Sequence, residues 1–491
     1  MMSKYNQLRA QYPFFDYEDY HWHVEPDGLH LRFDFRMGPV EFHPTAFIER
    51  RPFLDFSAGN LDLLVFNIGM IELISYWKCA CPPTVRIHCG SLTDNQISFW
   101  RKLYWHGLGE FFYTNGISES AEAFMQVGCM KSEDRTENSK PKKTSDLIPH
   151  TSDLYLVPIG GGKDSVVTLE LLRRAGKSIR PLIMNPRGAT IECARVAGFP
   201  IDEVLVIRRT IDPKLLELNV QGYLNGHTPF SAMLAFYTHL ASVLSGIPNV
   251  ALSNENSANE STVLGTSVNH QYSKSLEFED DFRSYVAHYP LPTANCQLPT
   301  TNCQLPTVNY PLPTAHCQLS TTNCPLPTYN YFSFLRPLSE LQIAMLFSRF
   351  SAYHDVFRSC NVGSKQDIWC GHCAKCLFAY IILSPFIAPD RLNAIFGKSM
   401  LDDSSLELEF RQLIGLAETK PFECVGTVSE VRQALQMAVQ RWYKDKKPKL
   451  LQSIQLSLPS PLSSLSILSP IGNLTPEERQ ILQVACTEKI N

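Results

Sequence analysis

The stretch LVPIGGGKDSVVTLELL, residues 156–172, decides the fold of this chain. An apolar, strand-like run ends in three glycines, and a Lys, an Asp and a Ser then lead into a helical pattern. Glycines after a strand let the backbone approach a ligand and direct successive N–H groups inward, and the following helix adds its positive N-terminal end. We therefore predict a polyphosphate-binding turn at Gly160, Gly161 and Gly162.

The sequence around this turn predicts a parallel sheet. Strand-like runs and helical runs alternate between residues 154 and 254, and the strands are almost continuously apolar. This alternation is typical of an α/β fold in which helices cover both faces of a parallel sheet. Ligands of such sheets bind at the carboxyl ends of the strands, where residues 160–165 are expected to lie.

The length of 491 residues predicts two or three domains. The N-terminal part alternates as strands do and then becomes helical, which indicates an α+β domain, and a polar stretch after it reads as a linker. The predicted order is an α+β domain at 1–130, a linker at 131–150, the parallel-sheet domain at 151–400, a helical segment at 401–442, and a low-complexity tail at 443–491 with a short terminal helix capped by Thr475.

Residues 291–332 are six copies of a seven-residue unit, of which LPTANCQ is the first. Five copies carry proline at their second position, which argues against a coiled coil because proline lacks the helical N–H donor. We predict an extended, solvated insertion at 289–332 in a surface loop. Its cysteines are expected to have no role, and a cysteine-rich metal tract is the alternative.

Composition excludes several functional classes. A formal charge of −4 gives no reason to expect a broad nucleic-acid surface. The N-terminus has no signal pattern, and the longest apolar stretch, 376–389, is too short for a bilayer and contains prolines. We expect a cytoplasmic protein with no membrane partner. Fifteen cysteines in such a chain indicate reduced thiols or a metal site.

The spacing within the glycine turn differs from two common phosphate loops. A Rossmann turn needs G-x-G-x-x-G, and a Walker A loop needs Ser or Thr directly after Lys, whereas Asp164 separates Lys163 from Ser165. The turn instead resembles the PP-loop of ATP pyrophosphatases, S-G-G-x-D-S, with Gly160 in place of the first Ser. The resemblance implies an adenine nucleotide alpha hydrolase-like domain that cleaves ATP between the α and β phosphates and transfers AMP.

Polar residues at neighbouring strand ends are expected to complete the nucleotide site. Magnesium that bridges phosphates needs only one or two carboxylates, and Asp164 and Glu255 are the candidates. A polar solvated loop is the alternative for at least one acid of the stretch 253–260. This stretch follows a later strand and supplies Glu255, Asn259 and Glu260 as oxygen ligands for Mg²⁺. The resemblance implies two further contacts: Asn185 and Arg187 near adenine, and Arg336 near the pyrophosphate.

The stretch SCNVGSKQDIWCGHCAKC carries a cysteine cluster. Nine residues separate Cys360 from Cys370, and Cys373 and Cys376 follow at three-residue steps. Four thiolates at such spacing can close a tetrahedral zinc site, and a closed site is structural. We predict structural Zn²⁺. An iron–sulfur cluster and ordinary buried thiols are the alternatives.

Later motifs point to one family. NGHTPFSAMLAF, ALSNENSANE, VNHQYSKSLEFE, YFSFLRPLSELQIA and SCNVGSKQDIWCGHCAKCLFAYIILSPF resemble the UDP-N-acetylmuramoyl-L-alanyl-L-glutamate epimerase family over about 150–290 and 331–440. The resemblance implies that the substrate is a small molecule, a UDP-muramoyl dipeptide. Its terminal L-Glu would become D-Glu with ATP consumed and AMP and pyrophosphate released, in peptidoglycan precursor synthesis.

The chemistry of that reaction suits the turn. An ionised carboxylate resists loss of the adjacent Cα proton, whereas an acyl-adenylate has lost that charge and accepts electrons. Lys163, Asp164 and Ser165 are the expected catalytic residues of the turn, and His270 and Lys274 are candidates near the substrate. The N-terminal domain is the expected holder of the UDP-sugar, because no other part of the chain is left for it.

Three other functions remain open on the sequence. One is a PP-loop RNA-modifying ligase or thiolase, which would need a basic surface of tRNA size. A second is a deazaguanine nitrile-type synthetase with cysteine-bound zinc. A third is a nucleotide sensor without catalysis, which the retention of the Lys-Asp-Ser sequence argues against.

Overall fold

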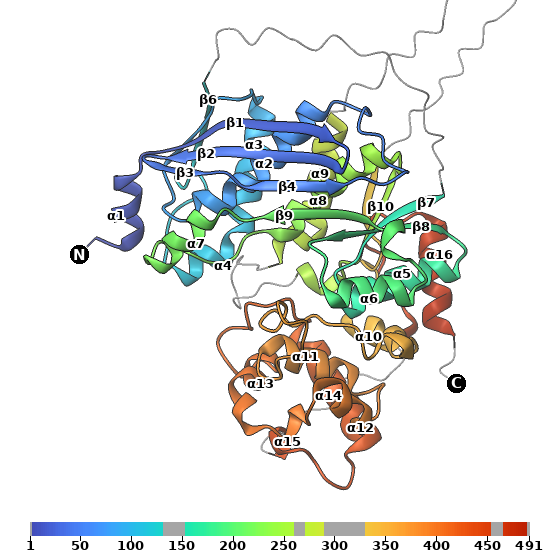
Figure 1. Ribbon diagram of the computed structural model, residues 1–491. Coiled ribbons are helices and arrows are strands. Elements are labelled where there is room, and N and C mark those ends of the chain that lie inside the picture. Colours follow the sequence, from blue (N-terminus) through green and yellow to red (C-terminus); the bar gives the residue numbers. More distant parts are fainter. Residues whose placement is uncertain (1, 131–152, 260–270, 289–328, 453–464, 489–491) are drawn as a thin grey trace, which may run out of the picture.

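The computed structural model describes residues 2–130, 153–259, 271–288, 329–452 and 465–488. One large mixed sheet forms its centre, in the strand order β11-β10-β7-β8-β9-β4-β2-β1-β5-β6, with β3 paired to β2 (Figure 1). The predicted linker at 131–150 and the first five copies of the heptapeptide repeat lie outside the described residues.

The N-terminal part supplies half of this sheet, as the alternating sequence predicts. Its long hairpin is antiparallel, and α2 packs against β1 and β2. Thr93 caps α3, because its side chain accepts from Gln96 N–H. The elements are α1 (Lys4–Gln11), β1 (Phe14–Glu25), β2 (Gly28–Met37), β3 (Val40–Phe42), β4 (Thr45–Glu49), α2 (Leu61–Trp77), β5 (Thr84–Ile87), α3 (Asp94–Gly107), α4 (Gly109–Thr114) and β6 (Gln126–Cys129).

The second half of the sheet is parallel, which confirms the prediction from strand–helix alternation. Strands β11, β10, β7, β8 and β9 all run in one direction. Their elements are β7 (Leu154–Pro158), α5 (Lys163–Arg174), β8 (Ser178–Met184), α6 (Gly188–Val196), β9 (Leu205–Thr210), α7 (Pro213–Val220), α8 (Phe230–Ser245), β10 (Asn249–Leu252), α9 (Leu276–His288) and β11 (Asn330–Ser333).

Both faces of the parallel strands are buried, in two different cores. Along β7, Leu156 belongs to the core shared with the N-terminal part, whereas Val157 belongs to the core under α5, α10 and α11. Leu182 and Ile183 divide in the same way along β8. Because successive side chains of a strand point to opposite faces, such runs must be apolar throughout.

The two halves meet where β4 pairs antiparallel with β9. Arg209, on β9, adds a buried ion pair there, since its Nε and Nη2 donate to the two carboxylate oxygens of Glu72 on α2, at 2.6 Å each. The sheet and one core therefore run across the boundary predicted between residues 130 and 151.

The predicted solvated insertion is wrong at its C-terminal end. Residues of the last repeat copy form β11, and Tyr331 and Phe332 are buried there. The aromatic residues of this copy fit a sheet edge because they alternate between two apolar cores. The remaining copies lie outside the described residues.

The C-terminal part is helical, as predicted for 401–442, and its helices between residues 374 and 452 gather below the sheet in Figure 1. The low-complexity tail also joins the fold, because Tyr155 Oη donates to Glu478 at 3.1 Å and α16 contacts α5. The predicted cap at Thr475 is confirmed. The helices are α10 (Glu340–Ser348), α11 (Ala374–Leu383), α12 (Pro389–Phe396), α13 (Glu407–Leu413), α14 (Val428–Trp442), α15 (Lys449–Gln452) and α16 (Pro476–Thr487).

Within the described ranges, every helix is too short or too polar to cross a lipid bilayer.

Replacing Gly69 with Ala is expected to destabilise the fold. A Cβ at Gly69, on α2, would lie 1.8 Å from Tyr17 Oη, and Tyr17 is fully buried on β1. Overpacking of this kind costs about 1–3 kcal/mol of unfolding free energy. Gly128→Ala is the control, because nothing lies within 4 Å of its Cβ position. Urea unfolding followed by circular dichroism measures both, and equal stabilities would contradict the prediction.

Candidate functional site

The glycine turn lies at the topological switch point of the parallel sheet, where the strand order reverses. Strand β7 has β8 on one side and β10 on the other, so the chain leaves β7 to build the sheet in both directions. Crevices at such positions are the usual ligand sites of α/β sheets. The predicted location of the turn, at the carboxyl end of β7 and the start of α5, is confirmed.

Each glycine of the turn has a different environment. Gly161 has φ +79° and a Cβ there would lie 3.1 Å from Ala189, so this position needs glycine. Nothing lies within 4 Å of a Cβ at Gly160, so its backbone faces open space. A Cβ at Gly162 would lie 3.3 Å from Ser359 Cβ. A ligand can therefore approach the backbone at Gly160.

Lys163, which follows the turn directly, forms a buried charge cluster with Asp164 and Glu340. Its ammonium group donates to Asp164 and to Glu340, and both Lys163 and Glu340 are buried. Burial alone would lower the pKa of Lys163, but the two carboxylates raise it on balance. Burial raises the pKa of Glu340, and Asp164 and Glu255 act in the same direction.

Asp164 is the accessible carboxylate of this cluster. Its side chain is 31% exposed, against 5% for Lys163. Burial would raise its pKa, but Lys163, Lys375 and Lys274 lower the pKa on balance, so the group is ionised. An ionised, accessible carboxylate is suited to bind a divalent cation. Ser165, in contrast, donates its hydroxyl to Gly162 O at 3.0 Å.

The loop after β10 brings Glu255 close to the Lys163 cluster. Its carboxylate accepts from Ser257 Oγ at 3.1 Å and is near enough to Lys274 to raise that residue's pKa. Arg336 connects this loop to the segment of Lys274, because its guanidinium donates to Glu255 O at 2.8 Å and to Lys274 O at 2.5 Å.

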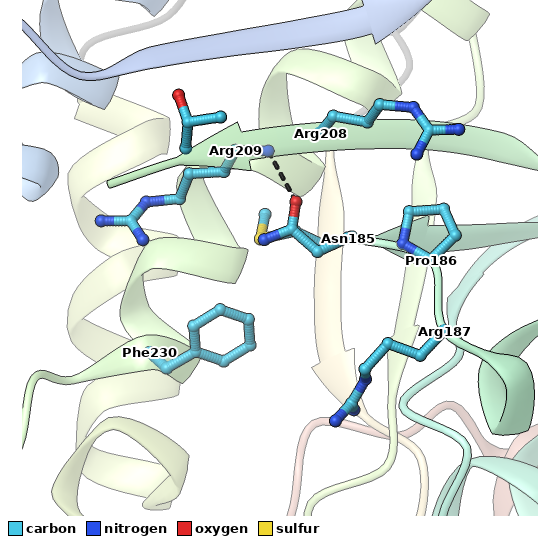
Figure 2. A pocket seen from close by; sticks show the side chains of 8 residues that line it. Asn185, Pro186, Arg187, Arg208, Arg209 and Phe230 are labelled. Carbon is cyan, nitrogen blue, oxygen red and sulfur yellow. Dashed lines mark hydrogen bonds between the residues drawn. The ribbon is translucent and has the colours of Figure 1, made fainter. Parts of the chain in front are cut away.

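A pocket of about 560 Å³ opens at the ends of β8 and β9 (Figure 2). Asn185 and Arg187, for which contacts with adenine were predicted, line it together with Arg208 and Phe230. The Asn185 side chain accepts from Arg209 N–H at 2.7 Å, shown as the dashed line. The side chains of Arg208 and Phe230 are exposed.

The four predicted cysteines lie together, as the spacing indicates. Their sulfur atoms are all within 4.8 Å of one another, with Cys360–Cys373 at 3.9 Å and Cys370–Cys376 at 3.7 Å. A tetrahedral zinc ion with Zn–S bonds of about 2.3 Å places its sulfurs about 3.8 Å apart. An iron–sulfur cluster would place several atoms between the thiolates and separate them more. The geometry fits one ion.

The cysteine segment also touches the glycine turn. Arg358 N–H donates to Gly161 O at 2.7 Å, and Asp367 Oδ1 accepts from Ala189 N–H, at the start of α6, at 3.0 Å. The cluster is thus connected by two hydrogen bonds to the backbone around the predicted nucleotide turn.

Comparison with known proteins assigns the family. The MurL N-terminal domain family matches residues 6–294, and the MurL C-terminal domain family matches residues 356–463. A curated protein of Xanthomonas oryzae pv. oryzae, named UDP-N-acetyl-alpha-D-muramoyl-L-alanyl-L-glutamate epimerase, is 32% identical over 442 residues, which is 87% of each chain.

This chain belongs to the MurL family.

Two further MurL relatives carry the same name. The protein of Salinispora tropica is 34% identical over 399 residues, covering 78% of this chain and 74% of its own. The protein of Micromonospora sp. is 31% identical over 403 residues, covering 81% of this chain and 79% of its own. No solved structure matches this chain. The MurL N-terminal domain match runs across the boundary predicted at 131–150, in agreement with the continuous sheet.

The predicted site residues of this MurL protein fall into three groups: residues that lie together, one residue that is buried elsewhere, and residues outside the described ranges. Asp164 of the turn, Glu255 and Lys274 lie close together. Arg336 is 0% exposed and bonded to backbone carbonyls, so its guanidinium is not available to a phosphate here, contrary to its predicted contact. His270, Glu260 and the side chain of Asn259 lie outside the described residues.

Several residues of the site were missed by sequence reasoning. Glu340 is the first residue of α10, after a Ser339–Gln342 capping box, and that box was the available signal. Asp367 and Cys424 lie in loops without a local pattern. Only the folded chain brings them to the turn and to Lys274.

Replacing Asp367 with Ala is expected to lower the free energy of unfolding by about 1 kcal/mol, because the first turn of α6 loses its capping acceptor. Asp367→Asn is the matched variant, since its amide oxygen still accepts and Asn tolerates the φ of 58°. Urea unfolding would contradict the prediction if the two variants lost equal stability.

Proposed function

We propose that this protein epimerises the terminal L-Glu of UDP-N-acetylmuramoyl-L-alanyl-L-glutamate to D-Glu, with ATP activation of its α-carboxylate. The family assignment and the names of three relatives support the epimerisation. The ATP step is supported by the Lys163–Asp164–Glu340 cluster under an open glycine turn. This cluster is the observation that carries the proposal.

The proposed reaction has four balanced steps. The α-carboxylate attacks the α-phosphorus of ATP, and pyrophosphate leaves. A base removes the Cα proton, and the electron pair passes to the acyl carbonyl oxygen. An acid then protonates Cα on the opposite face. Water releases AMP and restores the carboxylate.

Residues of the turn would act on the phosphates. The N–H groups at Gly160–Gly162 and the start of α5 would stabilise the departing charge, and Lys163 would compensate it from below. Asp164 and Glu255 fit a magnesium ion, because both are oxygen donors and Asp164 is ionised and accessible. Magnesium, when bound, neutralises phosphate charge.

Zinc would have a structural role in this proposal. Cys360, Cys370, Cys373 and Cys376 fit a closed tetrahedral site, and such a site leaves no open position for a substrate. Its contribution would be to fix the segment that contacts Gly161 and α6.

The purified full chain, ATP and Mg²⁺ test the proposal with three candidate substrates in parallel: the UDP-muramoyl dipeptide, tRNA and a deazaguanine carboxylic acid. Of the three candidate substrates, we expect only the dipeptide to give AMP and D-Glu. AMP formed only with tRNA or the deazaguanine acid would refute the epimerase assignment. Epimerisation without any nucleotide would refute the ATP step.

A further inference from the structure

Cys424 lies two residues before Gly426, which packs against Glu340 of the Lys163 cluster, and it has no role in the reaction as described so far. It belongs to the loop between α13 and α14, and it is partly exposed. Outside the four-cysteine cluster, Cys129 is the other partly exposed cysteine of the described residues. Cys79 and Cys193 differ from these two, because burial raises the pKa of each to about 12 and keeps the thiol protonated.

The sulfur of Cys424 is paired with a cation. Its side chain is hydrogen-bonded to Lys274. A neighbouring ammonium stabilises negative charge on sulfur, and the thiolate is the reactive form of cysteine.

The backbone on both sides of Cys424 is held firmly. Phe422 contacts the ring of Tyr113 on α4, with centroids 5.4 Å apart. The Cys424 carbonyl accepts from the Lys375 ammonium group, and Val425 O accepts from Gln271 Nε2 at 3.3 Å.

Gly426 then packs against the Lys163 cluster. A Cβ at Gly426 would lie 3.1 Å from Glu340 Cγ and 3.1 Å from a carboxylate oxygen of Glu430. The Glu340 side chain accepts from Lys163, so the loop adjoins the predicted phosphate site directly. A thiol fixed from both sides in this way is positioned for chemistry at a defined place.

We propose that the Cys424 thiol is one of the two groups that move the Cα proton of the terminal glutamyl residue. This inference rests on the proposed function. As a thiolate beside Lys274, Cys424 removes the Cα proton of the acyl-adenylate. An S–H bond forms as the C–H bond breaks, and the electron pair passes to the carbonyl oxygen. A second group donates a proton to Cα on the opposite face. The thiol then releases its proton to water, and the second group takes a proton up from water, so that both groups return to their starting states.

The test separates activation from proton transfer. In D₂O with ATP, Mg²⁺ and the UDP-muramoyl dipeptide, the exchange of Cα hydrogen for deuterium is measured by mass spectrometry. Exchange of radiolabelled pyrophosphate into ATP is measured beside it. We expect Cys424→Ala to slow Cα exchange and D-Glu formation at least about 100-fold, the usual effect of a general base. Pyrophosphate exchange is expected to stay within about threefold.

Cys129→Ala is the matched control, because Cys129 is equally exposed and lies on β6 in the N-terminal part. We expect it to behave as wild type in both assays. Normal Cα exchange in Cys424→Ala would overturn the inference. Equal loss of Cα exchange and pyrophosphate exchange would also overturn it, because Cys424 would then only maintain the structure of the site. A wild-type enzyme without pyrophosphate exchange would refute the proposed adenylation instead.

Alkylation of the unmodified protein gives a second measurement that needs no variant. Iodoacetamide is expected to label Cys424, and the dipeptide with a non-hydrolysable ATP analogue is expected to slow that labelling at least about tenfold. Labelling of Cys129 is expected to be unchanged. Equal labelling of Cys424 with and without these ligands would overturn the inference.

Discussion

Lys163→Met is expected to lower the rate of pyrophosphate exchange roughly 100-fold or more and to destabilise the fold. The lysine compensates charge at the predicted phosphate site, and electrostatic groups of this kind contribute about that much. Its loss also leaves Asp164 and Glu340 without their shared partner in a buried place. Breaking a buried ion pair from one side costs about 3–5 kcal/mol of unfolding free energy.

A double variant separates the two effects of Lys163. In Lys163→Met/Glu340→Gln the buried carboxylate is replaced by a neutral amide, so most of the lost stability is expected to return. Activity is not expected to return, because the amide cannot supply the missing positive charge. Urea unfolding and pyrophosphate exchange measure the two quantities. A double variant that regained activity would refute the role given to Lys163 at the phosphates.

Cys373→Ser is expected to remove zinc and to lower the melting temperature sharply. Structural zinc contributes folding free energy on the order of 10 kcal/mol in small domains, and Cys373 also begins α11. Inductively coupled plasma mass spectrometry should find one zinc per wild-type chain and a strongly reduced content in the variant. Chelator treatment of the wild type is expected to have the same effect on melting.

Cys129→Ser is the control for zinc binding, since Cys129 lies on β6 outside the cluster. Loss of zinc should weaken ATP binding as well, because the cysteine segment holds Gly161 and α6. Iron in place of zinc would contradict the single-ion geometry. Full thermal stability of the metal-free protein would contradict the structural role.

Local patterns in the sequence predicted those parts of the fold that local forces determine. The strand before Gly160, the helix after it and the cap at Thr475 agree with the structure because periodicity and capping act within a few residues. The cysteine cluster could be predicted because three ligands lie within one turn and the start of a helix.

Contacts between distant segments could not be predicted. Neither the sequence of β4 nor that of β9 contains a pattern that identifies the other strand as its partner, so their pairing could not be predicted. Arg336 looks like a phosphate ligand in sequence, but burial of its guanidinium makes it a support for two loops. Cys424 meets Lys274 only because the folded chain brings the loop between α13 and α14 against the Lys163 cluster.

The junction of β4 and β9 has a consequence for synthesis in the cell. Thr45 and Thr210, whose side chains meet there, are 165 residues apart. A ribosome adds about 5–20 residues per second, so β4 waits on the order of ten to thirty seconds for its neighbour. Throughout that interval the nascent chain displays an unpaired edge that can capture another polypeptide. Soluble yield is therefore expected to rise when a chaperone covers this edge until translation passes β9.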